Sequence, residues 1–153
     1  MIGLPGILPH HRYDRQEIAG LLSAKYSRYW QQGVVRVDSD FLLFVTLDKT
    51  GKPPEFQYAD RFLSATEFQW QSQNQESRAK RGAKYQNRGV VDLRFHLFVR
   101  RRAKDDNNNT AKFAYLGRVR FHSWEGDNPI NIRWALDIPV PSNLLSELDL
   151  PEG

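Results

Sequence analysis

The sequence predicts an α+β fold in which one N-terminal helix precedes a curved, mostly antiparallel sheet or a small barrel. Two observations predict it. Apolar residues recur at helical spacing only near the N-terminus, and from residue 41 onward short apolar or alternating segments follow one another, separated by turn-forming residues. With 153 residues and no internal repeat, the chain is expected to form one domain, 1–153. Its core is expected at about 13–142, before an acidic tail at 143–153.

The first expected element is a long helix in YDRQEIAGLLSAKYSRYWQQG, residues 13–33. Asp14 is placed to cap it and Glu17 follows three residues later, as in a capping box. Apolar side chains then recur at helical spacing before Gly33 ends the element: Ile18, Leu21, Leu22, Tyr26 and Tyr29.

Two strands are expected next. FLLFVTL, residues 41–47, is a near-continuous apolar run of strand length, and DKTGKPP after it is a turn. In FQWQSQNQ, residues 68–75, Phe68 and Trp70 alternate with glutamines. Because Ser64 and Glu67 stand in an S-x-x-E relation, a short helical turn remains an alternative here.

The C-terminal half contains the clearest strand, VVDLRFHLFVRRR, residues 90–102. One face carries Val91, Leu93, Phe95, Leu97 and Val99, and the other carries Asp92, Arg94, His96, Phe98 and Arg100. DDNNNT predicts a turn. KFAYLGRVRFHSW predicts a strand in which Gly117 marks a bulge or a close backbone approach, and INIRWALDIPV predicts the last strand.

The charge is distributed unevenly. The net charge is +4. The segment from residue 78 to residue 104 contains ten basic residues and a single acid, Asp92. We call this segment the basic strip. From Asp137 to the C-terminus there are four acids and no base. Such a concentration of positive charge is typical of a surface that binds phosphates, with a solvated loop and outer strand face as the alternative.

Several classes of chemistry lack their motifs. The absence of cysteine excludes disulfides, a thiol nucleophile and thiolate zinc sites, and the four histidines lack metal-binding spacing. No serine-nucleophile elbow or glycine-rich phosphate loop is present. No cofactor or metal is therefore expected. Asp48, Lys49 and Asp60 leave a metal-dependent nuclease as a weak alternative. Without a signal peptide or an apolar run of spanning length, the protein is expected to be cytoplasmic, away from membranes.

Aromatic and amide side chains lie next to the basic strip in sequence. Phe62, Phe68, Trp70 and Tyr58 fall within thirteen residues and glutamines are interleaved with them. A nucleobase needs a ring to stack on and amides or carboxylates for its polar edge. The alternative is that these rings belong to the core and the glutamines to the outer face of a strand.

The segments FVTLDK, YADRFLSATEFQWQSQNQ, HLFVRRR and FAYLGRVRFHSWEGDNPINIRWALDIPVP resemble a C-terminal domain of unknown function. That family is appended to bacterial superfamily 2 helicases and to phospholipase D-type nuclease-helicases. The resemblance covers about residues 13–142, and FQWQSQ is its most specific part. It implies a fold similar to the SRA and PUA-like domains, and a role as target reader in modification-dependent restriction enzymes.

The resemblance further implies a site. The chain would flip 5-methylcytosine or 5-hydroxymethylcytosine out of double-stranded DNA into a pocket formed or supported by Tyr58, Asp60, Phe68, Trp70, Gln71 and Ser72. We expect Tyr58, Phe68 or Trp70 to stack on the base and Asp60 or Gln71 to read its polar edge. Phosphates are expected on Arg78, Lys80, Arg81, Lys84, Arg88, Arg100, Arg101, Arg102 and Lys104.

Helicase and nuclease activities would then reside in other domains or partners, in cis or in trans, and this chain is not expected to be an enzyme. Two alternatives stay open: a module that binds RNA or single-stranded nucleic acid, and a regulatory partner domain of a helicase that binds no nucleic acid.

Overall fold

The structure is a computed structural model that describes residues 6–48, 60–71, 94–104, 107–125 and 131–148. The elements in chain order are β1 (Arg12–Tyr13), α1 (Arg15–Leu21), the 3₁₀ helix η1 (Arg28–Gln31), β2 (Val34–Val37), β3 (Asp40–Thr46), β4 (Arg61–Ser64), β5 (Glu67–Gln71), β6 (Arg94–Arg100), β7 (Phe113–Glu125), β8 (Asn131–Leu136) and α2 (Ser142–Leu148). The predicted α+β class is confirmed.

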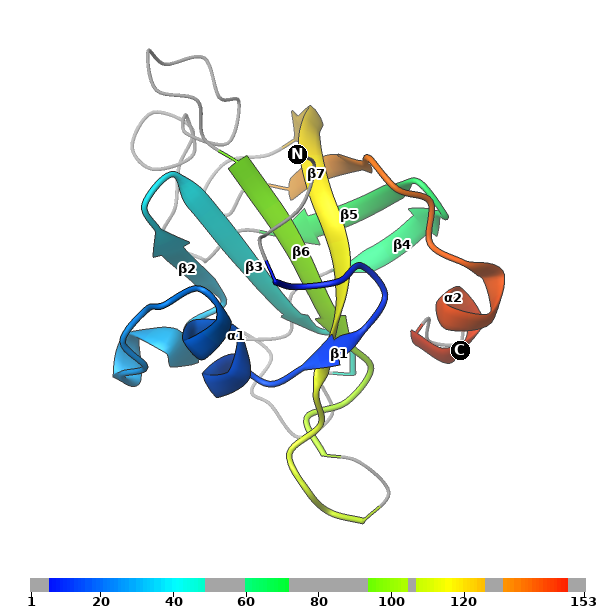
Figure 1. Cartoon of the computed structure of the whole chain (residues 1–153). Helices are drawn as coiled ribbons and strands as arrows, with labels where there is room; N and C mark the ends of the chain where they lie inside the picture. The colour runs from blue at the N-terminus through cyan, green and yellow to red at the C-terminus, as the bar shows by residue number, and fades with distance from the viewer. Residues whose placement is uncertain (1–5, 49–59, 72–93, 105–106, 126–130, 149–153) are drawn as a thin grey trace.

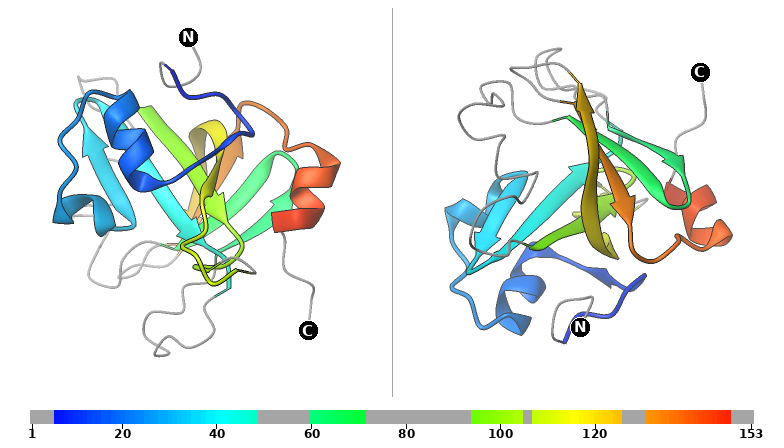
Figure 2. Two further views of the ribbon diagram at one scale, coloured as in Figure 1. Left: turned by 60° about the horizontal axis from the view of Figure 1, so that its bottom comes forward. Right: turned by 90° about the horizontal axis from the view of Figure 1, so that it is seen from above.

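Eight strands form one mixed sheet in the order β2-β3-β6-β7-β8-β5-β4, with β1 paired to β7. The sheet is open and curled (Figures 1 and 2). Among the described strands only β3 and β6 pair in parallel, in register from Asp40↔Arg94 to Thr46↔Arg100. The prediction of a curved and mostly antiparallel sheet is therefore confirmed, in its open form.

The central strands are buried on both faces, which explains the continuous apolar run of β3. Leu43 and Leu97 belong to one hydrophobic cluster, which also takes in side chains of β5, β8 and α2. Leu42 and Phe98 belong to a second cluster, which Ile18 of α1 and Trp30 of η1 help to cover. Strands that are buried on both faces have continuous apolar sequences, because neither face is exposed to solvent.

The long helix predicted for residues 13–33 is wrong in length. Its start is confirmed, since Asp14 accepts from the Glu17 backbone at 2.7 Å and the Glu17 side chain accepts from the Asp14 backbone at 3.1 Å. The α-helix ends at Leu21, and Ser23 has φ of 55°. The chain then forms η1, in which Trp30 is buried, whereas Tyr26 and Tyr29 are exposed.

Gly117 marks a bulge, as predicted. Two residues of β7, Leu116 and Gly117, lie opposite Leu97 alone, because His96 pairs with Arg118 and Phe98 pairs with Tyr115. Gly117 has φ of +89°, and a Cβ at this position would stand 3.4 Å from Ile138 Cδ1. A left-handed conformation next to a packed side chain favours glycine.

Two further differences concern the ends of elements. Ser64 and Glu67 do not begin a helical turn: they pair across the β4–β5 hairpin, where Ser64 Oγ accepts from the Thr66 backbone at 3.2 Å. The expected acidic tail begins with α2, whose Leu144 and Leu148 are buried, so the core extends beyond residue 142. In the part of the chain that the structure describes, no helix is long and apolar enough to cross a membrane.

Candidate nucleic-acid interface

A groove of about 270 Å³ lies where β6 ends. We call it the basic groove, because six of its lining side chains are cationic and one, Glu147, is acidic. The cations are Arg12, Arg100, Arg101, Arg102, Lys104 and Lys112.

Sheet topology brings these distant residues together. Arg12 enters from β1, whose pairing with β7 places it opposite Ala114. Lys104 and Thr110 pair as an isolated antiparallel bridge between the end of β6 and the start of β7. The described residues on both sides of this bridge extend past the ends of the two strands (Figure 1). Two of the cations are paired: Arg12 with Glu147 of α2, and Lys112 with Glu17 at 3.0 Å.

The remaining four cations of the basic groove have no carboxylate partner among the residues that the structure describes. They are Arg100, Arg101, Arg102 and Lys104. Arg102 and Lys104 are exposed. Uncompensated cations in a groove raise the local concentration of polyanions and exchange their counterions for phosphates.

A second hollow of about 480 Å³ adjoins the basic groove, with which it shares Arg100 and Ala111. We call it the arginine pocket. Arg15 of α1 lines it, and its Nη1 donates to the carbonyls of Trp30 at 2.8 Å and Gln32 at 2.7 Å. Arg100 donates from Nε to Thr46 Oγ1 at 2.8 Å and from Nη1 to the carbonyl of Ala111 at 3.1 Å.

Both guanidiniums of the arginine pocket pack on the buried ring of Phe113, Arg100 at 4.3 Å and Arg15 at 5.1 Å from its centroid. Burial, together with the charge of Arg100, lowers the pKa of Arg15 to about 10. Burial also lowers the pKa of Arg100. Two like charges thus line one pocket, held by carbonyls, a hydroxyl and an aromatic ring, and an anion bound in the pocket would reduce their repulsion.

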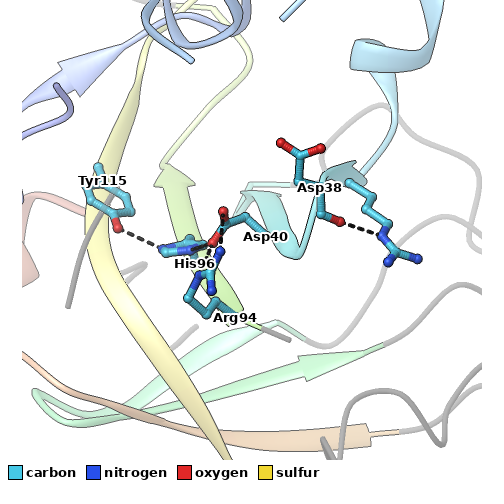
Figure 3. A network of polar contacts seen from close by, with 6 residues as sticks. Asp38, Asp40, Arg94, His96 and Tyr115 are labelled. Carbon is cyan, nitrogen blue, oxygen red and sulfur yellow. Dashed lines mark hydrogen bonds and ion pairs between the residues drawn. The ribbon is translucent and has the colours of Figure 1, made fainter. Parts of the chain in front are cut away.

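A polar network crosses the centre of the sheet (Figure 3). His96 of β6 is fully buried, with Nδ1 2.8 Å from Tyr115 Oη and Nε2 2.8 Å from Asp40 Oδ1. Arg94 contacts both oxygens of Asp40, from Nε at 2.8 Å and from Nη2 at 3.2 Å. Because His96 and Tyr115 are buried, the network joins strands and offers neither side chain to a substrate.

Phe68 and Trp70, two of the predicted stacking residues, belong to the core. Their exposed fractions are 0% and 4%, and they pack against Phe62 and Trp134 with ring centroids 4.9 Å and 6.4 Å apart. Neither ring presents a face to a base in this structure. Of the three rings expected to stack, the third, Tyr58, lies outside the described residues. Alternation places them on the inner face of β5.

The other predicted pocket residues are partly described. Asp60 Oδ1 accepts from the backbone of Gln71 at 2.9 Å, so these two residues do lie together. Tyr58 and Ser72 lie outside the described residues. Near this strand, Gln69 lines a small hollow of about 120 Å³ with Trp124 of β7 and Arg133 of β8.

Of the predicted phosphate contacts, the structure gathers those at the end of β6 in the basic groove. The others, Arg78, Lys80, Arg81, Lys84 and Arg88, lie outside the described residues. Arg12, Arg15 and Lys112 were missed by sequence reasoning. The sequence contains no signal for them, because only strand pairing and the fold of α1 bring them to Arg100.

Comparison with known proteins places the chain in one family. The family described as "Domain of unknown function (DUF3427)" matches residues 7–148. None of the curated proteins matches the chain. Within the described residues, no three histidine or acidic side chains are grouped to hold a metal ion.

Proposed function

The chain belongs to the DUF3427 family of domains of unknown function, and we propose that it is a DNA-binding module that reads a modified base. The observation that carries the proposal is the basic groove, in which four cations have no carboxylate partner among the described residues. A groove of this kind suits a phosphate backbone.

The identity of the base is proposed from the resemblance to helicase-associated target readers with an SRA- or PUA-like fold. In this proposal the base is 5-methylcytosine or 5-hydroxymethylcytosine, extruded from double-stranded DNA. Extrusion costs a few kcal/mol of stacking and pairing, so contacts to both the base and the phosphates are needed to offset it. The partners proposed for the module are helicase and nuclease domains that act on the recognised DNA.

The test is a binding titration with otherwise identical duplexes that contain cytosine, 5-methylcytosine or 5-hydroxymethylcytosine, at one stated salt concentration. We expect a modified duplex to bind more tightly than the unmodified one. Burial of one methyl group contributes only about 1 kcal/mol, or roughly fivefold, unless the shape of the pocket adds to it. Equal affinity for all three duplexes would remove the modified base from the proposal. Tighter binding of single-stranded DNA or RNA than of any duplex would show that the ligand is single-stranded nucleic acid.

The role of the basic groove is tested by reversing two exposed charges. The double variant Arg102→Glu with Lys104→Glu should bind duplex DNA at least tenfold more weakly, because it places two acids against phosphates. The matched control is Lys25→Glu with Arg61→Glu, which changes net charge equally at two exposed residues outside the groove. Equal losses in both double variants would show that the groove is not the binding surface.

A further inference from the structure

We propose that the arginine pocket is a nucleotide-binding site in which Arg15 and Arg100 hold a phosphate while Tyr26 and Gln31 contact the attached base. This rests on the proposed function, because a strand bound in the basic groove would deliver the nucleotide. The pocket and the groove share Arg100 and Ala111, so the two sites adjoin.

The donors needed for a phosphate are present. A guanidinium has five N–H groups. Arg15 uses two of them, both on Nη1, which leaves its Nε and Nη2 side for bidentate binding of an oxyanion. Arg100 uses Nε and one N–H of Nη1. The second N–H of Nη1 and both N–H groups of Nη2 remain for the same ligand.

The surrounding contacts hold both arginines in place before any ligand arrives. Carbonyl acceptors and the Phe113 ring fix the two side chains, and so little side-chain freedom is lost on binding. Asp14 is the acidic residue among the lining side chains, and its carboxylate is engaged as the cap of α1. Positive charge therefore dominates the pocket.

The rim offers the groups that a base needs. Tyr26 is 40% exposed and lines the pocket with Gln31. Gln31 Nε2 donates to Tyr26 Oη, which ties the amide to the ring. No described residue donates to Gln31 Oε1, so this oxygen is an acceptor for an exocyclic amine such as N4 of cytosine. The pairing of aromatic ring and amide that the sequence predicts near residues 58–72 thus also occurs here.

The experiment compares 2′-deoxycytidine 5′-monophosphate, deoxycytidine and inorganic phosphate by calorimetric titration of the full chain at low salt. We expect the monophosphate to bind at least tenfold more tightly than either of the other two. Gln31→Leu should weaken its binding tenfold or more, since the acceptor for the exocyclic amine of the base is lost. Gln32→Leu is the matched control: Gln32 is the neighbouring residue, is also exposed and does not line the pocket, so less than a twofold change is expected.

Each of the other possible results contradicts a defined part of the proposed nucleotide site. If the monophosphate does not bind, or if both variants weaken it equally, the arginine pocket is not its site. If inorganic phosphate binds as tightly, the base contacts are wrong. Duplex binding is measured on the same samples: a chain that binds duplex but not the monophosphate retains the proposed function and loses this inference. Binding of the monophosphate without binding of duplex would contradict the proposed function. The nucleotide could then not be supplied by a DNA strand bound in the basic groove.

Discussion

At the residue scale, the network around His96 has one consistent assignment of protons. Burial lowers the pKa of His96, although Asp40 opposes the shift, so the imidazole is neutral at pH 7. Burial raises the pKa of Asp40, but hydrogen bonds from His96 and Arg94 outweigh it and lower the pKa to about 2. His96 Nε2–H therefore donates to the Asp40 carboxylate, and its Nδ1 accepts from the Tyr115 hydroxyl.

Asp40→Asn is expected to destabilise the fold by about 2–3 kcal/mol, because a charged acceptor shared by two donors is lost while His96 stays buried. Asp38→Asn is the matched control, since Asp38 is exposed and its carboxylate points away from the network (Figure 3). Its effect should stay within about 0.5 kcal/mol. Urea denaturation of both variants measures the difference, and equal effects would contradict a special role for Asp40.

Stability should fall in two stages as the pH is lowered. The pKa of His96 is below its ordinary 6.5, so below about that pH the unfolded chain binds this proton first and the folded state loses stability. The pKa of Asp40 is depressed from 3.8 to about 2, so its contribution is complete above about pH 4 and is lost between pH 4 and 2. The free energy of unfolding measured from pH 7 to 2 should show the second stage in the native chain and lack it in Asp40→Asn. An identical acid limb in both would contradict this assignment.

At the scale of elements, β7 connects two parts of the sheet and has a register shift against each, at Leu116 and Gly117 opposite β6 and between Phe121 and Ser123 opposite β8. β7 is 13 residues long and pairs with β6 over one part and with β8 over another. A bulge increases local twist and bends the strand, which allows one strand to belong to two differently oriented parts of the sheet. Gly117 at the bulge is thus a structural requirement.

Gly117→Ala should destabilise the fold by about 1–2 kcal/mol, because alanine is strained at φ of +89° and its Cβ meets Ile138. Gly20→Ala is the matched control. Gly20 lies inside α1 with nothing within 4 Å of an added Cβ, so alanine should stabilise the helix by up to about 1 kcal/mol. Thermal unfolding distinguishes the two signs, and a stabilising Gly117→Ala would refute the role of the bulge.

The elements that the sequence predicts well are those with a simple period. The strands around Leu43, Phe95 and Trp134 are found as expected, since alternation or a buried apolar run follows directly from strand geometry. The helix at residues 13–33 was predicted too long, because Tyr26 and Tyr29 continue the helical spacing after the chain has turned at Ser23. Burial of Trp30, a tertiary contact, determines the real geometry.

The candidate site was less predictable than the strands. Arg100 and its neighbours are visible as a run of charge, but Arg12 and Arg15 join them only through β1 pairing and the packing of α1. For Phe68 and Trp70, alternation cannot distinguish a ring that lines a pocket from one that fills the core. Their burial decides the matter in this structure.

At the scale of the whole molecule, the cations of the basic groove and the arginine pocket lie side by side. A bound duplex releases counterions from each phosphate it places there, so affinity should fall as salt rises. The double variant Arg102→Glu with Lys104→Glu should make the plot of log K against log salt shallower by about 2, because two phosphate contacts are removed. Lys25→Glu with Arg61→Glu should leave the slope unchanged. An unaltered slope in the first double variant would place the phosphates elsewhere.

The parallel pair of β3 and β6 has a consequence for synthesis of the chain. Paired residues such as Asp40 and Arg94 are 54 positions apart, so β3 can pair with β6 only after the intervening residues and β6 itself have been translated. Until then Leu42 and Leu43 have no partner on that edge. Closing such a long loop slows folding to about the millisecond-to-second range of domains rich in non-local contacts. During synthesis we therefore expect the apolar residues of β3 to be exposed until β6 is available, which makes this segment a candidate for binding by a chaperone.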